Sequence, residues 1–247
     1  MTVHEAAARG FARSADAYER ARPGYPLAAL DWLAERLGLR AGRTVVDVAA
    51  GTGKLTRLLA ATGARVVAVE PVDEMRALVA PPAQVLAGTA EDLPLPDAGA
   101  DAATVAQAFH WFDGDRALAE LHRVLRPGGH LALVWNRRRL EDPLQAALEE
   151  LLAPVRGDVP AHRSDRWRAA FARTQRFGPL EERDFPHAQA LDAGGLADRI
   201  GSISFVAAAD DATRAELLAR VQALVPAKGG TVTLRYLCAV QVAERRA

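Results

Sequence analysis

The sequence predicts an α/β protein built on a doubly wound, mostly parallel sheet. Three observations predict this fold class. Short apolar segments alternate with helix-compatible segments along most of the chain, and each apolar segment is a continuous run, as expected of strands that helices cover on both faces. The first run, residues 44–48, also leads into a glycine-rich turn and the start of a helix. With 247 residues, of which 50% are hydrophobic, the chain suits one large domain with room for an insertion.

Turn-forming residues bound each predicted element of the first half. Two prolines around a glycine, within residues 22–26, stop any preceding helix, and Gly38 and Gly63 lie where helices end. The predicted helices span residues 27–37, 55–61, 73–79 and 115–125. The predicted strands span residues 44–48, 65–69, 84–87, 102–106 and 130–135, and a Pro-Gly-Gly turn precedes the last of them.

The pattern changes after Asn136. Residues 137–179 contain prolines at 143, 154 and 160 and two expected helices but no clear strand, which predicts a helical cap or insertion. A strand near 180–187, a helical region to about 225 and a last strand over 231–242 complete the chain. We therefore expect a single domain, 1–247, with a helical segment over the site (1–40), a ligand-binding core (41–136), the cap (137–179) and the remaining core elements (180–247).

Composition excludes several classes of protein. Lys plus Arg equals Asp plus Glu at 31 each, so no global charge draws the chain to nucleic acid or to an anionic membrane. Arginine and alanine are abundant and lysine is rare, which is typical of a high-GC bacterial genome. Cys238 is the only cysteine, which leaves no internal disulfide or cysteine-rich metal cluster. Without a membrane-length apolar run or a signal-peptide core in residues 1–10, a cytoplasmic protein is expected.

The turn after the first predicted strand narrows the class of ligand. A P-loop would need a glycine in place of Val48 and a hydroxyl in place of Leu55. A dinucleotide turn would need a third glycine where Thr56 stands, and Asp47 would repel an approaching pyrophosphate. S-adenosyl-L-methionine (SAM) has no phosphate and carries a sulfonium and an ammonium group, which an acid attracts. The turn Gly51-Thr52-Gly53 beside Asp47 therefore favours SAM, with S-adenosylhomocysteine as the product.

Two later positions support an adenosine-containing ligand. Glu70 directly follows the second predicted strand, where a carboxylate can accept hydrogen bonds from both ribose hydroxyls. Ala90 and Glu91 follow the third predicted strand, where an adenine would lie and backbone amides could read its edge. A solvated strand-end acid and a purely structural turn are the alternatives.

These features resemble successive signatures of the class I SAM-dependent methyltransferases, most nearly the type 11 small-molecule group. The resemblance is strong over residues 10–136 and looser beyond them. Tyr18, Arg22-Pro23-x-Tyr25-Pro26 and Phe109-His110-Trp111-Phe112 are similar to the branch that includes trans-aconitate methyltransferases. The motifs that match the whole family are Asp47-x-x-x-Gly51-Thr52-Gly53, Glu70, Gly88–Pro94 and Arg123–Gly129.

The resemblance implies a Rossmann-like sheet of seven strands with the last strand antiparallel. It implies that Gly51 and Gly53 contact the methionine moiety of SAM, and that Gln107, at the end of the fourth strand, faces the methionine end and the transferred methyl group. Glu70 would bind the ribose, and the Ala90–Glu91 region the adenine. Many relatives have Asp where Thr89 stands, so the adenine contact of that side chain departs from the family pattern.

Methyl transfer from a sulfonium is an in-line displacement that needs no metal, so positioning and desolvation can supply much of the catalysis. A hydroxyl or carbon acceptor needs a base, and His110, just past the fourth strand, is the candidate, with a packed structural histidine as the alternative. The candidate substrate-binding residues are Tyr18, Arg22, Tyr25 and Trp111.

The sequence thus predicts a SAM-dependent methyltransferase that acts on a small molecule, with a hydroxyl or carboxylate oxygen as the favoured acceptor and nitrogen or carbon as further options. A SAM-binding cyclase or ligand sensor on the same fold is an alternative, and a nicotinamide-dependent oxidoreductase is a more distant one. We expect a monomer or homodimer that binds neither nucleic acid nor membranes.

Overall fold

The computed structural model describes residues 21–156, 167–226 and 229–247. Tyr18 lies outside the described residues. The strands are β1 (Thr44–Val48), β2 (Arg65–Val69), β3 (Gln84–Leu86), β4 (Ala100–Ala106), β5 (Leu125–Arg138), β6 (Glu181–Leu191) and β7 (Val232–Glu244). The helices are α3 (Leu27–Leu37), α4 (Lys54–Ala60), α5 (Asp73–Arg76), the 3-10 helix η1 (Phe109–Trp111), α6 (Gly114–Val124), α7 (Pro143–Arg156), α8 (Arg168–Arg173), α9 (Ala193–Gly201), α10 (Ser204–Ala207) and α11 (Asp211–Gln222).

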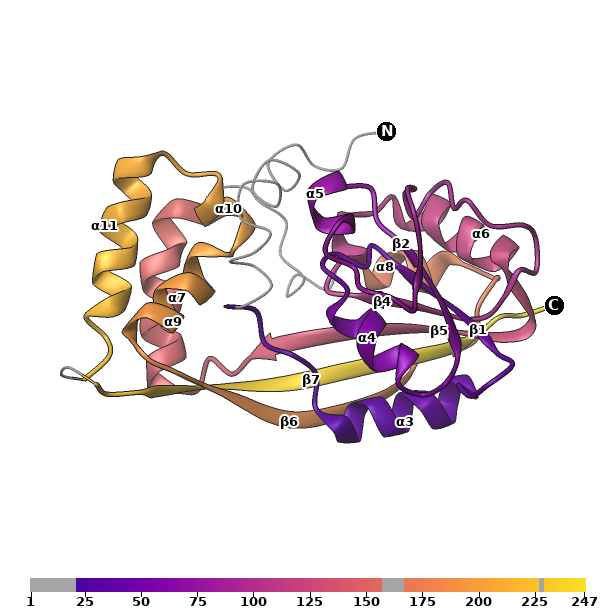
Figure 1. Cartoon of the computed structure of the whole chain (residues 1–247), viewed down its shortest axis with the longest axis horizontal. Coiled ribbons are helices and arrows are strands. Elements are labelled where there is room, and N and C mark those ends of the chain that lie inside the picture. The colour runs from indigo at the N-terminus through magenta and orange to yellow at the C-terminus, as the bar shows by residue number, and fades with distance from the viewer. Residues whose placement is uncertain (1–20, 157–166, 227–228) are drawn as a thin grey trace. The chain divides into compact units, whose positions relative to one another are not determined.

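The strands form one seven-stranded sheet in the order β3-β2-β1-β4-β5-β7-β6 (Figure 1). Parallel pairs join β1 to β2 and β4, β2 to β3, and β4 to β5. β7 runs antiparallel to its neighbours. This arrangement confirms the prediction of a doubly wound, mostly parallel sheet whose last strand is antiparallel.

Burial on both faces explains why the parallel strands are apolar throughout. In β1, Val46 and Val48 belong to one core cluster together with Leu118 and Leu121 of α6. Val45, which points to the opposite face, belongs to a second cluster. That second cluster contains Trp32 and Leu33 of α3 and Leu55 and Leu59 of α4. Since every position of such a strand faces a layer of helices, alternation of polar and apolar residues is lost.

A buried carboxylate lies at the amino-terminal ends of these parallel strands. Asp101 of β4, 6% exposed, accepts hydrogen bonds from the Thr44 backbone N–H at 2.8 Å, from Arg43 at 2.8 Å and from Arg126 at 2.7 Å. Burial acts to raise the pKa of Asp101, but these donors outweigh it and hold the pKa below its usual range. One side chain therefore ties together the beginnings of β1, β4 and β5.

β5 differs most from its predicted bounds, 130–135. The predicted turn around Pro127 and Gly128 lies inside the strand, because the end of β7 pairs with it: the backbone N–H of Arg245 donates to the carbonyl of Gly129 at 2.7 Å. Gly128 provides a left-handed conformation, φ 73°, at this bend. A partner more than a hundred residues away in the sequence thus extends the strand.

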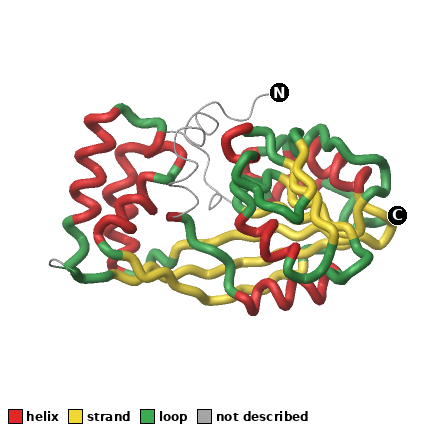
Figure 2. The backbone as a smooth tube through the Cα atoms, in the orientation of Figure 1, coloured by secondary structure: helices red, strands yellow, loops and turns green. Residues whose placement is uncertain are grey.

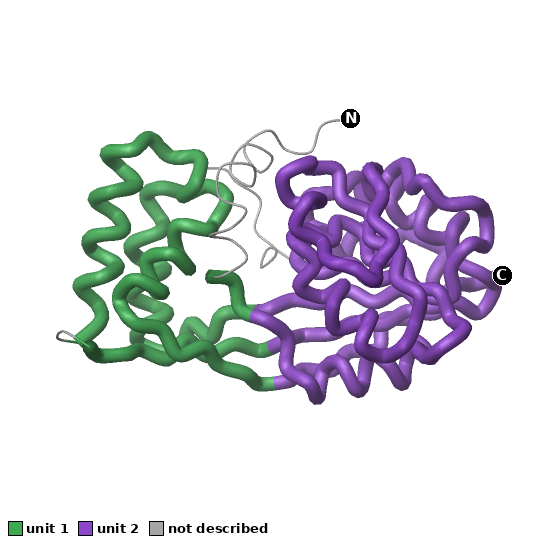
Figure 3. Tube along the Cα trace, viewed as in Figure 1, with its two compact units in different colours: residues 1–23, 137–159, 186–237 green, residues 24–136, 160–185, 238–247 purple. Residues whose placement is uncertain are grey.

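The chain divides into two compact units (Figure 3). Unit 2 comprises residues 24–136, 160–185 and 238–247, and unit 1 comprises 1–23, 137–159 and 186–237. Of the segment expected to form the cap, 137–179, α7 belongs to unit 1 and α8 to unit 2. The expected organisation of the single domain stays a prediction.

The core of unit 1 is largely helical (Figure 2). Leu148 and Leu152 of α7, Ile200 of α9 and Val221 of α11 are buried together, and residues of β7 complete the cluster. Neither unit contains, within residues 21–156, 167–226 and 229–247, a helix long and apolar enough to cross a bilayer.

Candidate functional site

The carboxyl ends of β1, β2 and β4 meet at one edge of the sheet in unit 2. Val48, the last residue of β1, is in register with Val69 of β2 and Val105 of β4. From β1 the chain adds β2 and β3 on one side, and β4 and β5 lie on the other. Such a reversal of strand order opens a crevice at the carboxyl ends, which is where doubly wound sheets bind ligands.

The turn after β1 is held in a left-handed conformation. Ala49, Gly51 and Gly53 have φ values of 54°, 58° and 82°. A Cβ atom added to Gly53 would lie 3.2 Å from Val79 Cγ1, so packing and conformation together account for this glycine. A Cβ atom added to Gly51 would meet nothing within 4 Å. The backbone at Gly51 therefore borders open space, as a close approach to a ligand requires.

Glu70 connects the end of β2 to this turn. Its carboxylate, in a residue 5% exposed, accepts hydrogen bonds from the backbone N–H groups of Gly51 at 2.8 Å and Val72 at 2.9 Å. Burial raises the pKa of Glu70, and these two bonds oppose the rise. Each carboxylate oxygen has two lone pairs, so each can accept one further hydrogen bond from a ligand.

Asp47 lies beneath the turn and braces three elements. It is 1% exposed, and its two oxygens accept hydrogen bonds from the hydroxyls of Thr56 in α4 at 2.6 Å and Thr104 in β4 at 2.7 Å. Burial raises the pKa of Asp47 to about 6. The structure gives Asp47 a positioning role, while the predicted contact with SAM stays a prediction.

Thr56 and Thr104 were not predicted as site residues. Thr56 stands where a dinucleotide fingerprint has its third glycine, and Thr104 lies within the apolar run of β4. A hydroxyl inside a strand that is otherwise apolar was the available signal, because a buried polar group needs a partner.

Gln107 follows β4 in a left-handed conformation, φ 59°. Its backbone N–H donates to the carbonyl of Val134 at 2.9 Å. Its side-chain Nε2 is buried and has no hydrogen-bond partner among the described residues. Gln107 combines a left-handed backbone with a buried amide donor that has no partner among the described residues, at the carboxyl end of β4. Both properties suit a ligand-binding position.

The segment after β3 forms a rigid turn beside this edge. The Ala90 side chain is buried in the core, and the Glu91 carboxylate accepts a hydrogen bond from the Asp113 backbone N–H at 2.9 Å. A Cβ atom on Gly88 would lie only 2.6 Å from Pro94 Cδ. The Glu91 carboxylate is thus engaged within the protein, and the adenine contact of the Ala90–Glu91 region stays a prediction.

Arg123, at the end of α6, holds the continuation of that segment. Its guanidinium donates to the carbonyls of Leu93 at 3.1 Å and Leu95 at 2.8 Å, and to the carboxylate of Asp97 at 2.8 Å. This side chain explains structurally why the Arg123–Gly129 motif accompanies the Gly88–Pro94 motif.

The remaining predicted residues are distributed over both units. His110 and Trp111 lie in η1, and both are half-buried; the His110 ring centroid lies 4.6 Å from that of Trp111 and 5.7 Å from that of Trp135. Tyr25, in unit 2, packs partly buried against the cluster around α3. Arg22, in unit 1, donates from Nη2 to the carbonyl of Ser202 at 2.8 Å.

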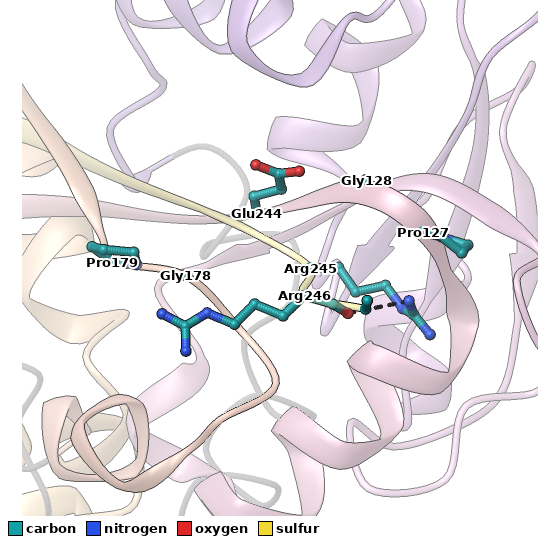
Figure 4. Close-up of a pocket in the computed structure, with 8 residues that line it drawn as sticks. Pro127, Gly128, Gly178, Pro179, Glu244, Arg245 and Arg246 are labelled. Atoms are coloured by element: carbon teal, nitrogen blue, oxygen red, sulfur yellow. Dashed lines mark hydrogen bonds between the residues drawn. The ribbon is translucent and has the colours of Figure 1, made fainter.

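A separate cavity of about 440 Å³ lies at the other end of β5, at the last residues of β7 (Figure 4). Arg245 and Arg246 line it, and the Arg245 guanidinium is bound to the carbonyls of His122 at 2.9 Å and Arg246 at 3.2 Å. None of the predicted site residues lines this cavity.

Comparisons with known proteins agree with this geometry. The methyltransferase domain family (Methyltransf_11) matches residues 46–133. An uncharacterized methyltransferase of Mycobacterium tuberculosis is 39% identical over 221 residues, which cover 87% of this chain and 85% of that protein. The ubiquinone/menaquinone biosynthesis C-methyltransferase UbiE of Escherichia coli is 32% identical over 174 residues, covering 64% of this chain and 68% of that protein.

A solved structure is similar over nearly its whole length. A protein of Anaeromyxobacter dehalogenans assigned as a type II methyltransferase superposes with a TM-score of 0.68 at 29% identity, covering 91% of this chain and 97% of that one. The finer resemblance to the trans-aconitate branch stays a prediction. With the glycine turn, the strand-end acid and the seven-stranded sheet in place, these matches show that the chain belongs to the class I SAM-dependent methyltransferases.

Proposed function

We propose that this protein transfers a methyl group from SAM to a small-molecule acceptor, with an oxygen acceptor favoured. One observation carries the proposal: the open backbone at Gly51 lies between two buried acids at the crevice of the sheet. Glu70 bonds directly to the Gly51 N–H, and Asp47 lies below the same turn. A ligand that brings positive charge gains from this pair of acids, whereas a pyrophosphate is repelled.

The residues present fit SAM. The Gly51 backbone can approach the methionine moiety, Glu70 has acceptor capacity for the ribose hydroxyls, and the unused Nε2 of Gln107 can donate to the methionine end. Backbone groups of Ala90 and Glu91 would read the adenine. Bound SAM supplies an activated methyl group on a sulfonium, and the protein's part is to orient the donor and exclude water.

The acceptor atom decides whether a base is required. A carboxylate is already nucleophilic, whereas a hydroxyl or an activated carbon must lose a proton. The Escherichia coli relative is named a C-methyltransferase, so carbon acceptors belong in any search for the substrate. We favour oxygen because the acceptor-side candidates include an arginine, Arg22, and a histidine, His110, which suit an acidic or hydroxylated molecule.

Calorimetric titration of the purified protein with S-adenosylhomocysteine tests the proposal, with NAD titrated in parallel. We expect S-adenosylhomocysteine to bind and NAD to give no heat of binding, because only NAD places a pyrophosphate beside Asp47 and Glu70. Tight binding of NAD, or binding of neither molecule, would contradict the proposed use of the site.

Replacement of His110 by alanine tests its role as a base. Turnover with a hydroxylated acceptor should fall by about a hundredfold or more, while the dissociation constant of S-adenosylhomocysteine stays unchanged. Transfer of labelled methyl from SAM to a panel of small phenols, alcohols and carboxylic acids measures this. The carboxylic acids are the internal control, since their methylation needs no base. Unchanged transfer to every hydroxylated acceptor would remove His110 from the mechanism.

A further inference from the structure

Unit 1 contains a buried arginine that no acid neutralises within the described part of the chain. Arg199, in the last turn of α9, is 7% exposed. Its Nε donates to the hydroxyl of Tyr236 at 3.3 Å, and its Nη1 is buried without a hydrogen-bond partner. No ion pair of Arg199 exists among residues 21–156, 167–226 and 229–247.

Three acids of unit 1 that the structure describes are engaged elsewhere. Glu149 is paired with Arg138 and Arg156, and Asp142 is paired with Arg235. Asp192 caps the beginning of α9 by accepting from the Gly195 N–H at 2.7 Å. Removing a guanidinium from water is unfavourable unless an anion compensates it, so a buried arginine of this kind is incomplete without one.

A role at the end of the helix does not account for Arg199. Cations near a helix C-terminus stabilise the helix dipole at exposed or partly buried positions, and this stabilisation is smaller than the cost of burying an uncompensated guanidinium. The last carbonyls of α9 have other donors: the Ser202 N–H bonds to the Asp198 carbonyl and the Ser202 hydroxyl to the Arg199 carbonyl at 2.8 Å. The Arg199 guanidinium donates to none of them.

The described side-chain partner of Arg199 adds no negative charge. Tyr236, which is 1% exposed and accepts from Arg199, stacks on His187 with ring centroids 5.2 Å apart. Burial lowers the pKa of the half-buried His187, which favours the neutral form of its ring. Arg22 donates to the carbonyl of Ser202, three residues beyond Arg199 in the chain. Arg199, Tyr236 and His187 thus form a connected cluster, and Arg22 contacts the backbone that follows α9.

We infer that this cluster binds an oxyanion, a carboxylate or phosphate, of the methyl acceptor, and that Arg199 is its anchor. A guanidinium with unused N–H groups matches the planar or tetrahedral oxygens of either anion. The inference rests on the proposed function in one respect, that the bound anion belongs to the acceptor. It narrows the substrates to small organic acids or phosphate esters.

Nuclear magnetic resonance of arginine side chains tests the binding directly. The Nε–Hε signal of Arg199 is identified in the spectrum of the ¹⁵N-labelled protein, because this signal is absent from the spectrum of the Arg199→Lys variant. Sodium acetate and inorganic phosphate are then titrated separately, with sodium chloride at matched ionic strength. A saturable shift of this signal is expected with acetate if the acceptor is a carboxylate and with phosphate if it is a phosphate ester. No saturation with either anion would overturn the inference without any variant being needed.

Thermal denaturation of variants distinguishes a role of Arg199 in anion binding from a purely structural role. Arg199→Met should lose the anion-dependent rise in Tm, with affinity weaker by about ten- to a hundredfold. In chloride alone, this variant should be at least as stable as the wild type, because an uncompensated buried charge is gone. Arg220→Met, at an exposed position of α11, is the matched control and should retain the rise. An Arg199→Met protein that is destabilised in chloride and still responds to anions would assign Arg199 a structural role.

Transfer of labelled methyl from SAM connects the anion site to the acceptor. Carboxylic acids or phosphate esters should be methylated in preference to their neutral amide or alcohol counterparts, and Arg199→Met should remove that preference. The titration with S-adenosylhomocysteine keeps the two proposals apart. If that ligand binds but the Arg199 signal never saturates, this inference alone fails; if the ligand does not bind, the proposed function fails whatever Arg199 does.

Discussion

Replacement of Glu70 by glutamine is expected to weaken the binding of S-adenosylhomocysteine by about one to two decades, since hydrogen bonds to a charged group contribute about 1.5–3 kcal/mol. The carboxylate has two tasks: it already accepts from the N–H groups of Gly51 and Val72, and it would accept from the ribose hydroxyls. Glutamine keeps a single acceptor oxygen, so it cannot satisfy both backbone donors and the ligand.

Calorimetry on the wild type, Glu70→Gln and Glu70→Ala measures this loss. Glu74→Gln, at an exposed position of α5, is the matched control and should bind as the wild type does. Glu70→Ala should also lower the free energy of unfolding, because two backbone donors lose their acceptor. A dissociation constant that is unchanged in Glu70→Gln would remove the carboxylate from the ribose site.

Replacement of Asp47 by asparagine should move stability and SAM affinity in opposite directions. Burial raises the pKa of Asp47 from 3.8 to about 6. In this range the folded state binds more protons than the unfolded state, so stability contributed by protonated Asp47 is lost as pH rises from about 4 to about 6. A shift of about two pKa units corresponds to about 3 kcal/mol, and Asp47→Asn should be more stable than the wild type above pH 6 by up to this amount.

Urea unfolding between pH 4.5 and 8 checks the effect on stability. The pKa of Glu70 is raised as well, by burial and in part by the Asp47 charge, and contributes a slope of the same sign. The difference between wild type and Asp47→Asn therefore reports Asp47 together with its effect on Glu70. Asp31→Asn, at an exposed position of α3, should change neither stability nor its pH dependence. Equal pH slopes in the wild type and Asp47→Asn would contradict a titration near pH 6.

The effect of Asp47→Asn on binding distinguishes its two roles. SAM carries a sulfonium charge that S-adenosylhomocysteine lacks. Loss of the negative charge of Asp47 should therefore weaken the binding of SAM more than the binding of S-adenosylhomocysteine. If both ligands lose equal affinity, Asp47 acts only through the threonine hydroxyls that hold the turn in place.

The first half of the fold could be predicted closely because its signals are local. The bounds of α3, β1 and β2 agree with the predicted ranges, since an apolar or helical segment lies between clear turn residues in each case. β5 was predicted less well. The length of β5 depends on pairing with β7, about a hundred residues away, and no short window of sequence contains that information.

The candidate site shows the same difference between local signals and contacts that are distant in the sequence. Gly51 and Glu70 could be located because each follows directly from a predicted strand. The bond between Thr104 and Asp47 joins residues 57 positions apart, and it follows only once β1 and β4 are known to be neighbours. Nothing in the sequence distinguishes Arg199 from the other arginines. Its distinguishing property is burial without a paired acid among the described residues, and this property is visible only in three dimensions.

The interleaved division of the chain limits how new specificity can arise in this protein. The two units alternate along the sequence in six stretches, so neither is encoded by one continuous segment of the gene. Three of the five boundaries between these stretches lie inside a strand, in β5, β6 and β7, so a recombination at any of the three would divide that strand. Change of acceptor is therefore expected to proceed by point substitutions, and a chimaera of two relatives should fold only if all three stretches of unit 1 are transplanted together.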